Sequence, residues 1–320
     1  MQATDESNTP KIAVSACLLG HPVRYNGGHK RDRFITDQLS HVLDFIPVCP
    51  EMEAGMSVPR PTIQLRRIEG ELRLVRSDDA SIDYTAAMAE VAKKRAQALQ
   101  GRISGFIFQK KSPSCGMERV PVASADGKPA DRTGVGMFVQ HFTRHCPLIP
   151  IEEEGRLNDP VLRENFLERV YALDRWNRLQ ADDVAGFIKF HARHKLMLLA
   201  RGTEAYTRLG RIVAGVQKND LTERRETYIA CFMEVMAERV SRKHHYNVLQ
   251  HMLGYFKKTL SSGDKQELLD LFQSYRLTQI PLATPIVLLK HHLRNHPVGY
   301  LAQQHYLKPY PETLALRSLM

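Results

Sequence analysis

Three of the five cysteines in this chain stand in the same kind of setting, in the turn-forming segment that follows a short apolar run. These runs and cysteines are residues 11–16 with Cys17, residues 45–48 with Cys49, and residues 103–108 with Cys115. If the runs are strands of one parallel sheet, their carboxyl ends meet at one edge, and the thiols become neighbours in space. Thiolates bind zinc, cuprous copper or iron–sulfur clusters, so the pattern predicts a metal site.

The spacing of these cysteines does not identify the metal. Separations of 32 and 66 residues match neither the closely paired cysteines of zinc ribbons and fingers nor the cysteine runs of ferredoxins. Buried or redox-active thiols are the alternative explanation. The other two cysteines fit a structural role: Cys146 lies before a predicted strand, on the opposite rim of the sheet, and Cys231 lies inside a periodic helical run.

Short apolar runs separated by helical stretches predict an open, mostly parallel, Rossmann-like α/β sheet over the first half of the chain. The predicted strands are residues 12–16, 45–48, 103–108 and 147–151, the predicted helices are residues 32–43, 83–99 and 134–145, and residues 63–65 and 72–75 are predicted to pair as a hairpin. Ligands of such sheets bind outside the carboxyl ends of the strands, where the three cysteines are expected.

From residue 158 onward the hydrophobic pattern is almost entirely helical. The predicted helices are residues 161–179, 184–201, 203–217, 222–260 with a break near His244, 264–275 and 285–295. At 320 residues the chain is long for one domain. We therefore expect a flexible N-terminus at residues 1–10, an α/β domain at residues 11–155 and an all-α domain at residues 156–320.

The net charge of +10 belongs almost wholly to the second half of the chain. Residues 156–320 contain 25 Lys and Arg against 16 Asp and Glu, whereas residues 1–155 contain 20 against 19. A basic domain beside a near-neutral one favours a nucleic-acid partner, although a merely soluble basic surface would have the same composition. Basic and aromatic residues interleave in three clusters, which supply the candidate contacts Lys189, Arg193, Lys195, Arg242, Lys243, Lys290 and Arg294.

The sequence lacks the features of a membrane or exported protein. No apolar window reaches the roughly 18 residues of a membrane helix, and the N-terminus lacks the pattern of a signal peptide. An odd number of cysteines without regular spacing fits a reducing compartment. We therefore expect a cytoplasmic protein, with no membrane association and no obligate protein partner.

The segments around the three cysteines resemble the signatures of the TudS thiouracil desulfidase family. They are residues 15–20 (Ser-Ala-Cys-Leu-Leu-Gly) with 23–28 (Val-Arg-Tyr-Asn-Gly-Gly), 49–51 (Cys-Pro-Glu) and 111–116 (Lys-Ser-Pro-Ser-Cys-Gly). The likeness covers roughly residues 10–152. The helical remainder resembles an accessory domain of unknown function that is fused to such desulfidases. The whole chain is thus similar to the two-domain RudS type, which removes sulfur from 4-thiouridine in tRNA.

The resemblance implies that Cys17, Cys49 and Cys115 hold a 4Fe-4S cluster with one open iron. It also implies a non-redox reaction in which the thiocarbonyl sulfur binds that iron and water attacks the carbon. Sulfide then leaves, and the base becomes uridine. The chemistry is coherent because thiophilic iron polarises the carbon and stabilises the leaving sulfide.

The resemblance also suggests roles for residues near the cysteines. Glu51 is our candidate for the acid/base that activates water or protonates sulfide, with an exposed structural Glu as the alternative. Ser112 and Ser114 would orient the water or donate to the base, whereas turn chemistry around the intervening proline is the alternative. The candidates for the substrate pocket are Arg24, Tyr25, Asn26 and Arg60. An Asp is common at the position of Asn26 in the resembling proteins, which puts an acid/base role there in doubt.

Two other functions remain open at this point. The same cluster could act on free thiouracil or on the thiouridine nucleoside, with the helical domain serving assembly. Alternatively, the cluster could be a redox sensor on a nucleic-acid-binding module that turns nothing over. A sensor would need neither a Glu nor a Ser beside its metal.

Overall fold

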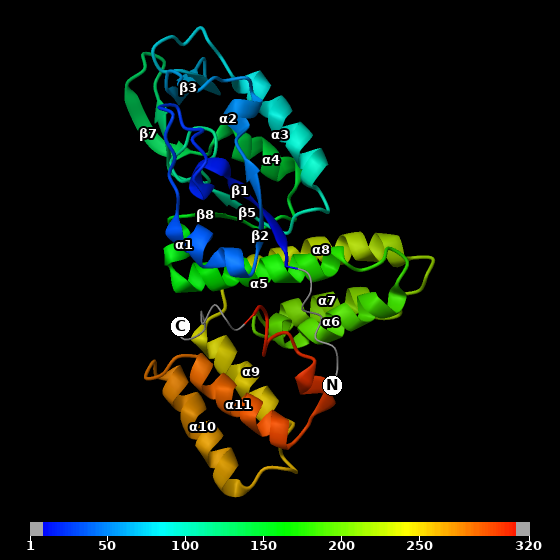
Figure 1. Ribbon diagram of the computed structural model, residues 1–320. Coiled ribbons are helices and arrows are strands. Elements are labelled where there is room, and N and C mark those ends of the chain that lie inside the picture. The colour runs from blue at the N-terminus through cyan, green and yellow to red at the C-terminus, as the bar shows by residue number, and fades with distance from the viewer. Residues whose placement is uncertain (1–8, 312–320) are drawn as a thin grey trace. The chain divides into compact units, whose positions relative to one another are not determined.

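The structure, a computed structural model, describes residues 9–311 of the chain. The chain divides into two compact units, Met1–Asn158 and Asp159–Met320 (Figure 1). The predicted fold class, an α/β region followed by a helical region, is confirmed. The predicted flexible N-terminus at residues 1–10 lies, except for its last two residues, outside the described residues.

A four-stranded parallel sheet forms the centre of the first unit, in the strand order β2-β1-β5-β8. Its strands are β1 (Lys11–Ser15), β2 (Asp44–Val48), β5 (Phe106–Phe108) and β8 (Ile151–Glu153). Ile12, Ala13 and Val14 of β1 are fully buried, as expected for a central strand that is covered on both faces. Since all four strands run in one direction, their carboxyl ends lie along one edge.

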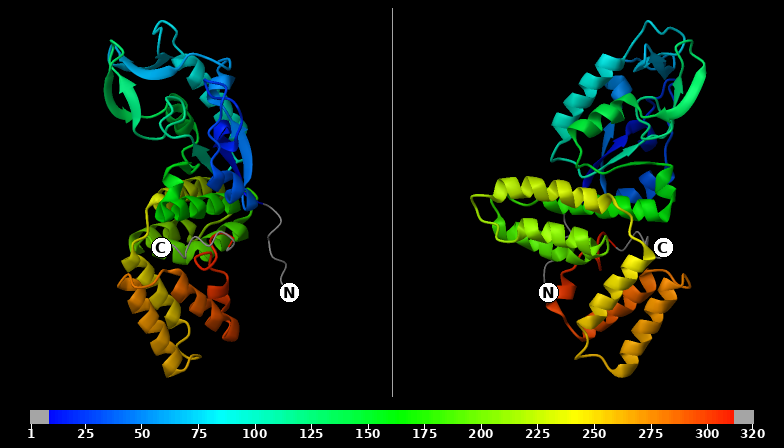
Figure 2. Two further views of the ribbon diagram at one scale, coloured as in Figure 1. Left: turned by 60° about the vertical axis from the view of Figure 1, so that its left-hand side comes forward. Right: turned by 180° about the vertical axis from the view of Figure 1, so that it is seen from behind.

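Four α-helices belong to this unit: α1 (Arg33–Asp37), α2 (Pro50–Glu53), α3 (Thr85–Leu99) and α4 (Met137–His145). Helices α3 and α4 lie side by side in both views (Figure 2). Phe138 and Phe142 of α4 pack edge-on against Phe106 of β5, which fixes the helix to the sheet. The predicted helix at residues 32–43 is shorter than expected, because after α1 the chain tightens into a 3₁₀ turn at Leu39–His41.

A second sheet, in the order β4-β3-β6-β7, also belongs to the first unit. It contains β3 (Ile63–Ile68), β4 (Glu71–Arg76), β6 (Val120–Ala123) and β7 (Pro129–Gly134). The predicted hairpin is confirmed as the antiparallel pair β3–β4. The β6–β7 hairpin was not predicted, and it moves the start of the expected helix at residues 134–145 to Met137.

The last strand of the parallel sheet differs from its prediction. The sequence predicts it at residues 147–151, but β8 comprises Ile151–Glu153. Two of the three consecutive glutamates at residues 152–154, near the end of the predicted α/β domain, are therefore in the strand, and all three are buried. They are tolerated there because each one has a hydrogen-bond or ion-pair partner in the first unit.

The second unit is entirely helical in the residues that the structure describes. Its helices are α5 (Pro160–Asn177), α6 (Val184–Leu199), α7 (Thr203–Val213), α8 (Leu221–Ala237), α9 (Arg242–Gly254), α10 (Ser262–Arg276), α11 (Ala283–Asn295) and α12 (Gly299–Ala302). The long helix predicted at residues 222–260 is broken before Arg242, where Ser241 Oγ accepts the N–H of His244 and caps α9. Within residues 9–311, no helix is both long and apolar enough to cross a membrane.

The side chain of Gln304 joins the segment after α12 to α6 through two hydrogen bonds. Gln304 Oε1 accepts the N–H of Leu196 at 3.1 Å, and its Nε2 donates to the carbonyl oxygen of Ala192 at 2.8 Å. These two backbone groups would otherwise bond to each other in the helix ladder. His305 N adds a third bond, to Arg193 O at 2.9 Å. The end of the described chain is therefore held firmly against the middle of α6.

Candidate active site

The carboxyl edge of the parallel sheet borders a cavity of about 330 Å³. Cys17, Cys49 and Cys115 all line it, so the strand ends bring the three predicted thiols together. Cys17 lies in the 3₁₀ turn after β1, Cys49 is the N-cap residue of α2, and Cys115 lies in the loop after β5. Cys146 is not among the lining residues; it ends α4, where Sγ lies 3.7 Å from Ala96 O.

The three thiols are desolvated and affect one another electrostatically. Burial, followed by the neighbouring Cys49 and Glu51, raises the pKa of Cys17 to about 11. Burial likewise raises the pKa of Cys49, and that of Cys115 lies well above the usual thiol value for the same reason. In the metal-free protein the three side chains are therefore neutral thiols, and a metal must displace their protons to bind.

The residues that line the cavity can supply three thiolates. Cysteine thiolates are the ligands that hold iron–sulfur clusters in proteins. The donor set Cys17, Cys49 and Cys115 therefore fits such a cluster.

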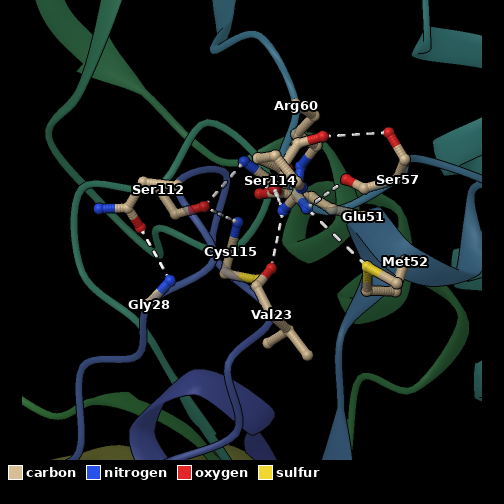
Figure 3. Close-up of polar contacts among 11 residues, drawn as sticks. Val23, Gly28, Glu51, Met52, Ser57, Arg60, Ser112, Ser114 and Cys115 are labelled. Carbon is tan, nitrogen blue, oxygen red and sulfur yellow. Dashed lines mark hydrogen bonds and ion pairs between the residues drawn. The ribbon is translucent and has the colours of Figure 1, made fainter.

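A fixed carboxylate lies on the wall of this cavity. Glu51, in α2, accepts a hydrogen bond of 2.9 Å at Oε1 from Ser114 Oγ, and its Oε2 forms an ion pair with Arg60 (Figure 3). Arg60 in turn donates to the carbonyl oxygens of Val23 and Ser57, both at 3.0 Å. Both oxygens of Glu51 are thus held by side chains that are themselves anchored, and the carboxylate has a defined direction beside the thiols.

The two serines near Cys115 occupy different positions. Ser112 lines the cavity, and its Oγ accepts the backbone N–H of Ser114 at 3.2 Å and of Cys115 at 3.1 Å. Ser112 thus shapes the turn that presents the thiol. Ser114 is fully buried behind the wall and reaches the site through Glu51. Gly136 supports this turn, because a Cβ there would lie 2.5 Å from Ser114 O.

Two buried glutamates that we did not predict as site residues hold the loop that carries Cys115. Glu154 Oε2 accepts the N–H of Lys110 at 2.7 Å, and Glu153 Oε1 accepts the N–H of Met117 at 2.7 Å. Glu154 Oε1 also forms an ion pair with Lys30 at 3.0 Å. The loop is therefore fixed at both ends by neighbouring carboxylates. In the sequence, the signal that could have identified these two glutamates is their position just after the apolar run at residues 147–151.

Three of the four predicted substrate-pocket residues line the cavity, and the fourth does not. Arg24, Tyr25 and Arg60 line the cavity, and the Arg24 guanidinium lies 5.5 Å from the centre of the Tyr25 ring. Asn26 is not a lining residue: it is exposed, and its Oδ1 accepts the N–H of Gly28 at 3.1 Å, which stabilises a turn. Further polar lining residues that we did not predict are Lys30, Thr62, Gln109, Lys110 and Lys111.

The predicted nucleic-acid contacts in the second unit are only partly at the surface. Lys189, Lys243 and Arg294 are exposed, whereas Arg193, Lys195 and Lys290 are half-buried. Arg242 is also half-buried; its Nη1 donates to Tyr275 O at 3.0 Å, and its guanidinium lies over the Tyr275 ring. The aromatic partners in these clusters, such as Phe190, are mainly core residues. The interleaved pattern therefore does not present aromatic rings to a ligand.

Comparisons with known proteins agree with the division into two units. Residues 12–154 match the family described as 2-thiouracil desulfurase, and residues 195–311 match a protein domain of unknown function, DUF1722. The uncharacterized protein YbgA of Escherichia coli (strain K12) is 30% identical over 157 residues, which cover 48% of this chain and 93% of YbgA. The uncharacterized protein YbbK of Bacillus subtilis (strain 168) is 33% identical over 134 residues, which cover 39% of this chain and 85% of YbbK.

One solved structure is also similar. It is described as the 4Fe-4S-dependent thiouracil desulfidase TudS and is 29% identical to this chain. The match covers 47% of this chain and 95% of that protein, with a TM-score of 0.38.

Proposed function

Because this chain belongs to the 2-thiouracil desulfurase family and carries a DUF1722 domain after its α/β unit, we propose that it hydrolyses thiolated uracil, with 4-thiouridine in tRNA as its substrate. The observation that supports this most directly is the placement of three thiols and one fixed carboxylate, Glu51, around a single cavity. The thiols suit a thiophilic cofactor, and the carboxylate suits proton transfer.

The cofactor in this proposal is a 4Fe-4S cluster held by Cys17, Cys49 and Cys115. The cavity has no fourth cysteine and no histidine among the described residues that line it, so one iron is left without such a ligand. When bound, the cluster supplies a thiophilic Lewis acid that polarises the carbon–sulfur bond of the substrate. Its loading requires deprotonation of three thiols whose pKa values are raised by desolvation, so iron binding releases protons.

Glu51 is the general base in this proposal. Hydrolysis replaces the thiocarbonyl sulfur by the oxygen of water and releases hydrogen sulfide, so both protons of the water pass to the sulfur. Glu51 Oε1 accepts one hydrogen bond from Ser114 and retains room for a second, which a water in the cavity would donate. The carboxylate takes a proton from that water and returns it to the departing sulfur.

Other residues of the cavity would bind and shield the base. Val23, Val48 and Ile63 contribute apolar lining, which limits access of bulk water to the reacting carbon. Tyr25 is 41% exposed at the cavity, where its ring offers a face for stacking on a pyrimidine. Arg60 orients Glu51 and does not need to touch the substrate.

Two features of charge favour a polynucleotide over a free base. Arg24 and Lys111 line the cavity, and neither forms an ion pair with a carboxylate in residues 9–311. The excess of 25 Lys and Arg over 16 Asp and Glu in residues 156–320 provides a second positive surface. Phosphate neutralisation by such groups gives affinity that is independent of base sequence and sensitive to salt.

The decisive experiment uses the full chain reconstituted anaerobically with iron and sulfide. It is incubated with bulk tRNA, and the loss of 4-thiouridine and gain of uridine are followed by nucleoside mass spectrometry. Release of one sulfide for each uridine formed supports hydrolysis, whereas unchanged 4-thiouridine overturns the tRNA assignment. The same protein is then given the free nucleoside. A strong preference for the nucleoside would favour the alternative, a desulfidase of small substrates.

A further inference from the structure

The second unit carries a small group of tyrosines that are not part of its core. The rings of Tyr255, which ends α9, and Tyr300, in α12, are stacked with centroids 5.1 Å apart and an interplanar angle of 24°. Tyr255 is 48% exposed, whereas aromatic residues such as Phe190 and Phe232 are buried. The exposed part of the Tyr255 ring is therefore available for stacking with a ligand.

A third tyrosine, Tyr206 in α7, is within electrostatic range of this pair. The pKa of Tyr300 is raised, first by burial and then by the hydroxyls of Tyr255 and Tyr206. Tyr206 also lines an open cavity of about 390 Å³ between α6 and α7. The walls of this cavity are largely apolar and include Ile188, which is 44% exposed. We call Tyr206, Tyr255 and Tyr300 the tyrosine patch.

The tyrosine patch is supported by rigid neighbours. Gln304 lies shortly after Tyr300 and is hydrogen-bonded to two backbone groups of α6, the helix that also lines the adjoining cavity. Tyr300 is therefore held in place relative to α6. A preorganised aromatic surface loses little conformational entropy when a ligand stacks on it.

Two lysines accompany the tyrosine patch. Lys195 lines the same cavity as Tyr206, and Lys258 is exposed and follows Tyr255 by three residues in the sequence. Neither lysine forms an ion pair with a carboxylate in the part of the chain that the structure describes. An apolar protein partner would gain nothing from these free charges, whereas a nucleic acid offers both aromatic faces and phosphates.

We propose that the tyrosine patch binds unpaired nucleotides of RNA, with bases stacked on Tyr255 and Tyr206 and phosphates near Lys195 and Lys258. A chain of nucleotides supplies bases that stack on the tyrosine rings and phosphates that pair with the two lysines. The inference deepens the proposed function, since it assigns part of the tRNA affinity to one surface of the second unit. It does not require the iron–sulfur site, so it can be tested separately.

The test measures binding of a fluorescently labelled oligouridylate to the full chain by anisotropy. Tyr255→Ala should weaken binding about tenfold, whereas Tyr255→Phe should retain most of it, because stacking needs the ring and not the hydroxyl. Val287→Ala is the matched control, since Val287 is 64% exposed in α11 and lies outside the patch. Lys258→Ala should reduce the salt dependence of binding by about one counterion.

Two results would overturn the assignment. One is unchanged affinity in Tyr255→Ala and in a Tyr206→Ala variant that remains folded. The other is an equal loss in Tyr255→Phe and Tyr255→Ala, which would indicate a hydroxyl contact in place of stacking. Desulfuration is measured in parallel: the alanine variants should lose kcat/KM for tRNA and keep it for the nucleoside. If the parent protein binds RNA through the tyrosines but never desulfurates tRNA, the proposed function fails while this inference stands.

Discussion

Ser114 Oγ donates a hydrogen bond of 2.9 Å to Glu51 Oε1, joining two residues that are 63 positions apart in the chain. Each is close in sequence to a cysteine of the cavity, Glu51 to Cys49 and Ser114 to Cys115. The contact therefore ties the second strand-end loop to the third. It also gives the carboxylate a fixed direction on one oxygen while Arg60 holds the other.

Glu51→Gln should reduce kcat for desulfuration by about 10²- to 10⁴-fold, because the amide keeps the size of the side chain but removes a general base. Iron content should remain that of the parent, since the three cysteines are untouched. Steady-state assays and iron analysis on the same preparation check both statements.

Glu53→Gln provides the matched control on the same helix. Glu53 is also in an ion pair, with Arg95, but it does not line the cavity. It should leave kcat within about twofold of the parent, as surface ion pairs contribute little. Equal losses in the two variants would show that the α2 helix, and not a base, was disturbed.

Ser114→Ala should lower kcat less than Glu51→Gln does and leave KM nearly unchanged, because Ser114 acts through Glu51 and does not line the cavity. Removing one hydrogen bond to a charged group costs about 1.5–3 kcal/mol, or roughly ten- to a hundredfold in rate. Ser114→Thr, which keeps the hydroxyl, should restore part of the activity. An increase in KM with unchanged kcat would contradict this positioning role.

Serine substitutions at Cys17, Cys49 and Cys115 should each reduce the iron and acid-labile sulfide that the chain retains after anaerobic reconstitution, because hydroxyls are poor ligands for iron. Cys146→Ser should retain the parent content, since this thiol is buried against Ala96. Metal analysis and visible absorption spectra test the prediction directly. Full iron content in any one of the three variants would remove that residue from the ligand set.

Glu154→Gln should loosen the loop from Lys110 to Met117. The change removes the buried negative charge that pairs with Lys30 and weakens the hydrogen bond to Lys110 N. The loss should lower the stability of the loop by about 1–3 kcal/mol. Hydrogen exchange of peptides that span this loop should accelerate. Glu71→Gln, at an exposed ion pair in β4, should leave the exchange unchanged. Slow exchange in Glu154→Gln would show that the loop is held mainly by other contacts.

The second unit should lose stability in mild acid. Burial lowers the pKa of His191 to about 4 and that of His194 and His305 well below the usual value of 6.5. Neighbouring groups contribute to these lowered pKa values: Lys195 for His191, Arg175 for His194, and His194 followed by Arg175 for His305. Between pH 6.5 and about 4 the unfolded chain binds protons that the folded chain does not, so stability falls as the pH falls.

Tryptophan fluorescence can follow this loss, because the chain has a single tryptophan, Trp176, and it stacks on Tyr228 in the core of the second unit. The urea midpoint should be steady above pH 6.5 and decrease toward pH 4. His191→Gln should flatten part of the slope, whereas substitution of the exposed His251 should not. A midpoint independent of pH across this range would refute the buried-histidine explanation.

The cavity could be predicted from sequence because its main elements are strongly patterned. Continuous apolar runs ending in turn residues mark the ends of β1, β2 and β5, and parallel pairing then brings Cys17, Cys49 and Cys115 to one edge. Each of these signals lies within a short stretch of sequence. The rule that the carboxyl ends of parallel strands lie along one edge of the sheet then places the three cysteines together.

The supporting groups could not be predicted in the same way. Glu154 is bonded to Lys30 and to Lys110 N, which are 124 and 44 residues away, and a glutamate triplet without known partners indicates a surface. The β6–β7 hairpin was missed because its strands contain Pro121 and Pro129, which weaken a strand signal. In both cases long-range contacts override the local preference.

In the helical unit, the sequence predicts where the helices lie but not which of their side chains are buried. The basic and aromatic clusters predict surface features. Phe190, His194 and His245 instead belong to the core. The exposed Tyr255 and the half-buried Tyr300 come from separate elements that only tertiary packing brings together.

The cavity is built from distant parts of the first unit, which determines when it can form during translation. The thiols come from three loops, and the loop of Cys115 is held by Glu153 and Glu154, which stand just before the end of the first unit at Asn158. Under the proposed ligand set, a nascent chain that has exposed only Cys17 and Cys49 lacks one of the three thiols and both glutamates that hold its loop. The proposed cluster therefore requires release of the entire first unit from the ribosome, but not of the helical unit.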